Sequence, residues 1–145
     1  MKKIAVVVLI LFLMTAAPVF AGEKSVVVED WIAKTVIDDE FIPVEEAYFY
    51  GLRHVCETFN YDVKWDSGHG YAIVTQGEGK TLTDENGNDI DALVIRPGVN
   101  SIEMHDGDIG KLDELLVEYK PFIDGNRLYV HSSVFAKYFG LETVD

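Results

Sequence analysis

Short runs of β-branched and aromatic residues recur along most of the chain, separated by turns rich in glycine, asparagine and aspartate. Such runs predict strands, and the turn residues predict reversals between them. No strand is followed by a long amphipathic helix and then a further strand, as a parallel sheet would require. The sequence therefore predicts an α+β fold, in which an antiparallel sheet of about five strands wraps against one or two helices.

The strand-like runs also define hairpins. Residues 61–66 and 71–76 flank the turn Ser-Gly-His-Gly and predict one hairpin. One or two strands are expected within 25–37, whereas 111–119 fits either a short helix or an extended strand. Further strands are expected at 92–96, 101–105 and 127–130.

The clearest helical pattern covers residues 43–60. Pro43 suits a first helical turn, and apolar residues follow at spacings of three and four. Gly51 falls on the same face, where it predicts either close packing or a break in the helix. Asn60 suits the C′ position, where a left-handed residue ends a helix.

A second, short helix is predicted from residue 132 to the Phe-Gly pair at 139–140. Ser132 or Ser133 would cap its first turn by accepting a hydrogen bond from a backbone N–H. Gly140 would end the helix at the C′ position.

Residues 1–21 have the pattern of a signal peptide. A basic start is followed by an apolar run from Ile4 to Phe20 and by small residues at the −3 and −1 positions before Gly22. The run is short for a membrane span, although an uncleaved anchor is the alternative. The position after the cleavage site is not cysteine, which disfavours a lipoprotein anchor. We therefore expect a secreted protein whose mature part, 22–145, is a single domain.

The mature chain is strongly acidic. Removing Lys2 and Lys3 with the signal peptide changes the formal charge from −13 to −15. Such a surface repels nucleic-acid phosphates and anionic membranes, so neither is an expected partner.

Cys56 is the sole cysteine, so the chain has no internal disulfide. Its neighbours Leu52, Val55 and Phe59 lie at helical spacing, which favours a buried thiol.

Metal binding receives little support from the sequence. The four histidines, His54, His69, His105 and His131, fall in four separate segments, whereas copper and zinc sites need clustered ligands. Calcium is the remaining alternative: "DENGND" places three oxygen-bearing side chains at the spacing that begins an EF-hand loop. These residues are Asp84, Asn86 and Asn88.

The calcium pattern is incomplete, because Asp89 stands at the sixth position in place of glycine and Ile95 at the twelfth in place of glutamate. The Asn-Gly pair within the segment also predicts an ordinary hairpin turn. We assign no metal ligand and no cofactor.

Two candidate nucleophile–base pairs are rejected on geometry. His54 and Cys56 are two residues apart on the expected helix and point about 200° apart. His131 beside Ser132 and Ser133 lacks the Gly-x-Ser-x-Gly elbow of a serine hydrolase, and adjacent residues rarely meet as nucleophile and base. We therefore assign no catalytic residue.

Several aromatic residues could form a sugar-stacking platform, although aromatic residues in the strands and helices of a small domain are more often core. The candidates are Trp31, Tyr48, Phe49, Tyr50, Trp65 and Tyr71. Tyr50 lies off the apolar face of the expected helix and is the aromatic for which we predict exposure.

The chain contains a weak internal repeat. Residues 51–66 and 131–145 each read as a helix ending in Phe-Asn or Phe-Gly, followed by an alternating strand. The first copy ends in Val-Lys-Trp-Asp and the second in Thr-Val-Asp.

These segments resemble the copper amine oxidase-like N-terminal domain, or stalk domain, found in exported proteins of Gram-positive bacteria. The resemblance covers residues 41–145 and rests on "LRHVCETFNYDVKWD", "IRPGVNSIEM" and "KPFIDGNRLYVHSSVFAKYFGL". It implies a five-stranded antiparallel sheet wrapped against a helix. In the amine oxidases this module is a stalk, distant from the copper and quinone chemistry.

Together these features predict a non-catalytic exported module that binds or presents another molecule at the cell envelope of a Gram-positive-type bacterium. Its expected partner is an envelope protein or polysaccharide. The alternatives are a small secreted calcium-dependent protein or hydrolase and a soluble inhibitor of an exported enzyme.

Overall fold

The computed structural model describes residues 19–21, 26–77, 81–84 and 86–144. Most of the predicted signal peptide therefore lies outside the described residues. Its last three residues form β1 (Val19–Ala21), which pairs with a strand at the other end of the chain, β14 (Glu142–Val144).

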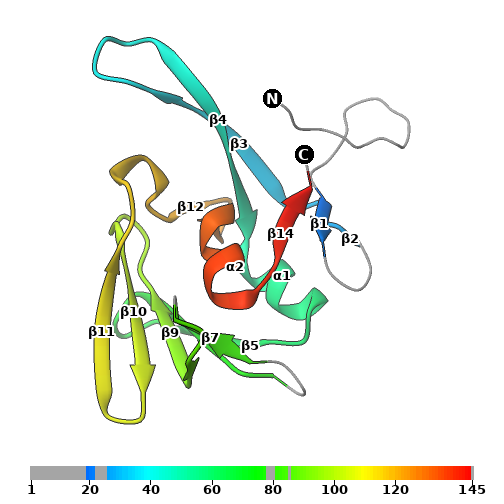
Figure 1. The fold of residues 1–145 in the computed structure, drawn as a ribbon, viewed down its shortest axis with the longest axis vertical. Helices are drawn as coiled ribbons and strands as arrows, with labels where there is room; N and C mark the ends of the chain where they lie inside the picture. The colour runs from blue at the N-terminus through cyan, green and yellow to red at the C-terminus, as the bar shows by residue number, and fades with distance from the viewer. Residues whose placement is uncertain (1–18, 22–25, 78–80, 85, 145) are drawn as a thin grey trace.

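The described residues form mostly antiparallel sheets with two α-helices, which confirms the α+β class (Figure 1). The largest sheet has five strands in the order β11-β10-β9-β6-β5. In chain order these strands are β5 (Asp62–Asp66), β6 (Tyr71–Thr75), β9 (Ala92–Ile95), β10 (Ser101–Asp106) and β11 (Ile109–Glu114).

A second sheet has four strands in the order β12-β13-β4-β3. These are β3 (Trp31–Ile37), β4 (Pro43–Gly51), β12 (Phe122–Asp124) and β13 (Arg127–His131). Two smaller sheets complete the arrangement: β2 (Val26–Val27) joins β1 and β14, and β7 (Leu82–Thr83) pairs with β8 (Asp89–Ile90).

The prediction of a helix over 43–60 is wrong in its first half. Residues 43–51 form β4, paired with β3 on one side and β13 on the other, and only α1 (Leu52–Thr58) is helical. The end of β4 is buried on both faces, because Phe49 faces a small cluster with Tyr129 while Tyr50 faces the main core. A strand buried on both faces loses the polar–apolar alternation, so its apolar residues imitate helical spacing.

The same misassignment explains the wrong prediction for Tyr50. The predicted exposure is wrong: the residue is fully buried, with its ring edge-on to Phe135 at 6.2 Å between centroids. Tyr50 is therefore a core residue.

Helix α1 ends as the sequence predicts. Asn60 has a φ of 67°, and the Tyr61 N–H reaches back to the Cys56 carbonyl at 2.8 Å. Cys56 itself is fully buried, which confirms its predicted place in the core.

The predictions for the second helix are confirmed in its course and end but not in its cap. Helix α2 spans Ser132–Phe139, and Gly140 follows it with a φ of 69°. The N-cap is His131 and not a serine, because a ring nitrogen of His131 accepts the hydrogen bond from the Ser133 N–H.

The remaining predicted elements agree with the structure. Residues 61–66 and 71–76 form the β5–β6 hairpin, and 127–130 lies in β13. The ambiguous stretch 111–119 is divided between the two alternatives, because β11 ends at Glu114 and the 3₁₀ helix η2 (Val117–Tyr119) follows.

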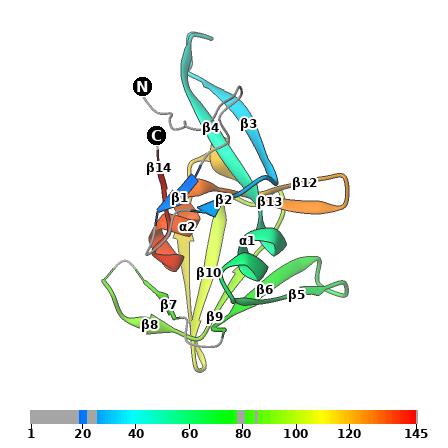
Figure 2. The ribbon, with the colours of Figure 1, turned by 90° about the vertical axis from the view of Figure 1, so that its right-hand side faces the viewer.

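The main core combines both helices with the inner face of the five-stranded sheet. Its buried residues come mainly from α1, α2, β6, β9 and β10, together with the ends of β4 and β13 and one residue each of β7 and β8. The β3–β4 hairpin extends away from this core in both views (Figures 1 and 2).

Gly51, at the junction of β4 and α1, provides a test of this arrangement. A Cβ at this position would lie 2.1 Å from the Asp30 Oδ2 atom. We expect Gly51→Ala to lower the free energy of unfolding by about 1–3 kcal/mol in urea denaturation, as overpacking does. Gly68→Ala is the matched control, because its nearest contact would be an ordinary 3.4 Å. An equal effect of the two substitutions would contradict the proposed close approach.

Candidate functional site

A cavity of about 320 Å³ lies between α1, the β5–β6 hairpin and the turn from β12 to β13. We call it the Trp65 pocket. The residues that carry its chemistry are Arg53, Glu57, Trp65, Asn126 and Arg127.

Trp65 gives the pocket an apolar wall. It lies on β5 directly opposite Ala72 of β6, and its side chain is 43% exposed. Cross-strand neighbours on one face pack side by side, and alanine is too small to cover an indole. The ring is therefore available to a flat apolar surface of a ligand.

Polar groups surround this ring. The Arg53 guanidinium lies 3.8 Å from a Glu57 carboxylate oxygen one turn further along α1, and both side chains are more than half exposed. Asn126 adds an amide from the β12–β13 turn, where its φ of 65° places it in the left-handed region. The pocket thus combines donors and acceptors beside an aromatic face.

Asp30 anchors the opposite side of the pocket. Its carboxylate accepts a 2.6 Å hydrogen bond from the Tyr129 hydroxyl and pairs with Arg127 at 3.3 Å. Burial, and secondarily the hydrogen bond to Asp30, raise the pKa of the Tyr129 hydroxyl. Asp30 is largely buried whereas the Arg127 side chain is 65% exposed, so its guanidinium is paired through one nitrogen and still accessible to a ligand.

The other aromatic residues considered for a stacking platform do not join Trp65. Trp31 and Tyr48 pack edge-to-face with each other, with ring centroids 5.7 Å apart. Tyr71, on the opposite face of the β5–β6 hairpin, stacks on His69 and lies under the Arg96 guanidinium at 4.7 Å. The platform is reduced to a single exposed indole.

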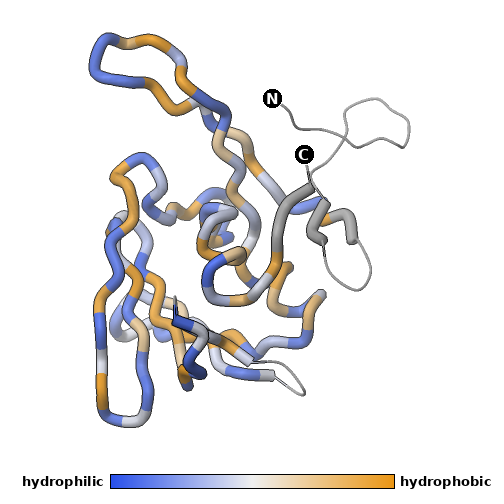
Figure 3. The backbone as a smooth tube through the Cα atoms, viewed as in Figure 1, coloured by the Kyte–Doolittle hydropathy of each residue, from blue (hydrophilic) through white to orange (hydrophobic). Residues whose placement is uncertain are grey.

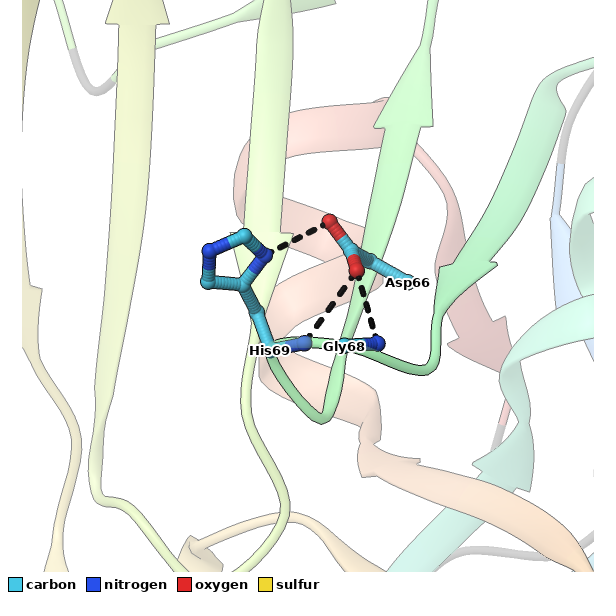
Figure 4. A network of polar contacts seen from close by, with 3 residues as sticks. All are labelled: Asp66, Gly68 and His69. Carbon is cyan, nitrogen blue, oxygen red and sulfur yellow. Dashed lines mark hydrogen bonds and ion pairs between the residues drawn. The ribbon is translucent and has the colours of Figure 1, made fainter.

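His69 belongs to a polar network at the β5–β6 turn (Figure 4). One oxygen of Asp66 accepts hydrogen bonds from the backbone N–H groups of Gly68 and His69, at 3.0 and 3.2 Å, and the other contacts the His69 ring at 2.9 Å. The His69 hydrogen bond holds the pKa of Asp66 below its usual value. Through these contacts the side chains of Asp66 and His69 stabilise the turn.

The three residues of the predicted calcium pattern, Asp84, Asn86 and Asn88, lie between β7 and β8, and Glu85 lies outside the described residues. Asp84 Oδ1 accepts hydrogen bonds from the backbone N–H groups of Asn86 and Asn88, both at 2.9 Å. These bonds, that of Asn88 first, lower the pKa of the Asp84 carboxyl. Gly87 has a φ of 82°, as the Asn-Gly turn signal predicts. The carboxylate oxygen is thus engaged within the turn.

His131 and Ser133 do meet, contrary to the prediction from their spacing. The His131 Nδ1 atom lies 2.8 Å from Ser133 Oγ and accepts the Ser133 backbone N–H at 3.1 Å. The ring is buried and stacks on Tyr119 with 3.6 Å between centroids. Neither residue lines the Trp65 pocket.

The four histidines remain apart, at α1, the β5–β6 turn, β10 and the start of α2. Within the described ranges, no group of three or more histidine, cysteine, aspartate or glutamate side chains is arranged to hold a metal ion. In the same part of the chain, no helix is long and apolar enough to cross a membrane.

Comparisons with known proteins return no relative: no family model matches the chain, and no curated protein or solved structure is detectably similar to it.

Sequence reasoning considered Trp65 only as one of six aromatic residues and did not identify the polar partners around it. Arg53, Asp30 and Asn126 come from segments distant in sequence, and the pairing of β4 with β3 and with β13 brings them together. The Trp-Asp pair that ends β5 was the one available signal for the pocket.

The buried His131 predicts a pH dependence of stability. Burial disfavours the imidazolium and lowers the pKa from 6.5 to about 4, although Glu45 on β4 opposes this. Unfolding between these values takes up a proton, so stability is complete above pH 6.5 and falls as the pH drops towards 4.

His131→Asn retains a side-chain acceptor for the N-cap without titrating. Urea denaturation of both proteins at several pH values should show that the wild type loses on the order of 2–3 kcal/mol more than this variant across the window. Carboxylates common to both proteins cancel in the comparison. Parallel stability profiles would show that His131 is not buried in its neutral form.

Proposed function

We propose that the chain is a non-catalytic exported module that binds a polysaccharide of the bacterial cell envelope in the Trp65 pocket. The observation that carries this proposal is the half-exposed indole beside the small Ala72, inside a cavity rimmed by arginine, glutamate and asparagine.

The chemistry of the pocket suits a sugar. A pyranose ring has an apolar C–H face, which can stack on the indole, and hydroxyl groups at its edge. Arg127 and Asn126 can donate hydrogen bonds to those hydroxyls, and Glu57 can accept them. The volume of about 320 Å³ is at the small end of the ~300–1,000 Å³ typical of ligand pockets, which suits a short stretch of glycan.

The positions of the side chains with strongly shifted pKa values support binding without catalysis. Burial raises the pKa of Cys56 and of Tyr119 to about 12 and lowers that of His131 to about 4. Strongly perturbed pKa values mark candidate catalytic groups, yet none of these three side chains lines the pocket. The acidic and basic groups of the pocket instead include the pairs Arg53–Glu57 and Arg127–Asp30.

We further propose that the chain is a divergent stalk domain built from two degenerate strand–helix–strand repeats. The element order supports this, since β4–α1–β5 and β13–α2–β14 follow one plan. The leading strands of the two units also pair antiparallel, with Tyr50 opposite Val130, so each strand enters its helix from the opposite direction. The pocket lies beside this junction, where α1 faces the start of β13.

Sugar binding can be tested with soluble glycan fragments released from Gram-positive cell walls. The chain has two tryptophans, so Trp31→Phe leaves Trp65 as the sole indole and its fluorescence should change on titration. We expect Trp65→Ala to weaken binding at least about tenfold, as loss of a central aromatic contact does. Trp31→Phe serves as the matched control and should bind as the wild type does. Equal affinity of Trp65→Ala and the control would refute this use of the pocket.

Export can be tested separately. Expressed in a Gram-positive host, the chain should appear in the medium or envelope with an intact mass that begins at Gly22. Replacing the small residue at the −1 position, as in Ala21→Phe, should block processing. A wild-type product that keeps residues 1–21 would contradict cleavage after Ala21.

A further inference from the structure

The tip of the β3–β4 hairpin, residues 37–44, presents apolar side chains to solvent. Phe41 is 87% exposed, and three further apolar residues of the tip are about half exposed. These are Ile37, Ile42 and Val44. The hairpin projects beyond the rest of the chain (Figure 2), and its tip alternates between hydrophilic and hydrophobic residues (Figure 3).

The turn at this tip is a defined structure. Asp38 Oδ1 accepts hydrogen bonds from the backbone N–H groups of Glu40 and Ile42, both at 2.9 Å. The Asp38 backbone adds two more bonds, from the Phe41 N–H at 3.0 Å and to the Ile42 carbonyl at 3.1 Å. The apolar side chains are therefore presented on an ordered backbone, which reduces the entropy lost on docking.

Phe41 is unfavourable here for the stability of the isolated chain. Its φ of 63° lies in the left-handed region, which bulky residues rarely adopt, and its ring has almost no contact with the protein. Asparagine or glycine would fit this backbone better, without exposing an aromatic ring. A strained residue with an exposed apolar ring indicates a role outside the folded chain itself.

Charge restricts what can cover the tip. Asp38, Asp39 and Glu40 lie beside Phe41, and the whole chain carries a formal charge of −13. A second copy of the chain and an anionic membrane would both be repelled. A protein with an apolar pocket rimmed by basic side chains is complementary in both respects.

We propose that the β3–β4 hairpin tip docks a partner protein: Phe41 inserts into an apolar pocket whose rim supplies Lys or Arg to Asp39 and Glu40. This surface is distinct from the Trp65 pocket, which borders Gly51 at the opposite end of β4. β4 has nine residues, so its two ends are ~26 Å apart. The module thus has one site for glycan and another for protein.

The partner is sought by placing a photoreactive benzophenone amino acid at position 41 of the full chain and exposing it to exported proteins of a Gram-positive bacterium. The matched control carries the same group at Ile109, which is 66% exposed and lies at the tip of the β10–β11 hairpin. We expect one protein to be crosslinked from position 41 and not from position 109.

That protein is then purified and its affinity measured against variants of the full chain. Phe41→Asn should weaken binding at least about tenfold, as removal of a central hot-spot residue does, while its melting temperature stays equal or rises. Glu40→Lys should weaken binding and reduce its dependence on salt. Ile109→Asn and Trp65→Ala should bind as the wild type does, which separates this test from the glycan proposal.

Three results would overturn the proposal. The first is crosslinking from position 41 that does not exceed that from position 109 or that joins only two copies of this chain. The second is an unchanged affinity of Phe41→Asn for the crosslinked protein. The third is binding of the wild type, but not of Phe41→Asn, to vesicles of zwitterionic or anionic phospholipid, since this would identify a membrane surface as the occupant.

Discussion

Asp30, whose carboxylate is largely buried, joins three segments on which the fold depends: the residues before β3, the end of β4 and the start of β13. Its backbone carbonyl accepts the Gly51 N–H at 2.9 Å, and its side chain holds Tyr129 and Arg127 on β13. The end of β4 and the start of β13 are therefore fixed against the residue that precedes β3. Each of these strands leads directly into a helix, β4 into α1 and β13 into α2. Disrupting a carboxylate with two hydrogen-bond donors and little solvent contact is costly, because the loss of one partner leaves buried polar atoms unsatisfied.

The Trp65 pocket is a consequence of this junction. Helix α1 leaves β4 at Gly51 and faces the turn before Arg127, and the β5–β6 hairpin supplies the third wall with Trp65. A side chain at position 51 would displace Asp30, so this position adds no side chain to the pocket wall. The pocket and the projecting hairpin tip therefore occupy opposite ends of one pair of strands. This arrangement keeps two surfaces of different chemistry apart on a small domain.

The sequence predicts most strands and both helix ends, because Asn60, Gly87 and Gly140 adopt the left-handed conformations their positions favour. It misassigns residues 43–51, since burial on both faces at the end of β4 removes the alternation that identifies a strand. It also misses the cap at His131, because histidine is not among the usual capping residues. The sequence does not predict the pocket; of its lining, only Trp65 is among the aromatic residues considered for stacking. The other residues of the pocket are brought together by long-range strand pairing, which local sequence patterns do not encode.

The lone cysteine has a further consequence for how the chain reaches its folded state. Cys56 is fully enclosed, and burial raises the pKa of its thiol to about 12, so the reactive thiolate is essentially absent at neutral pH. Folding requires no oxidant or disulfide isomerase, and the folded chain is insensitive to reductants. Refolding after dilution from denaturant should therefore show no slow redox step.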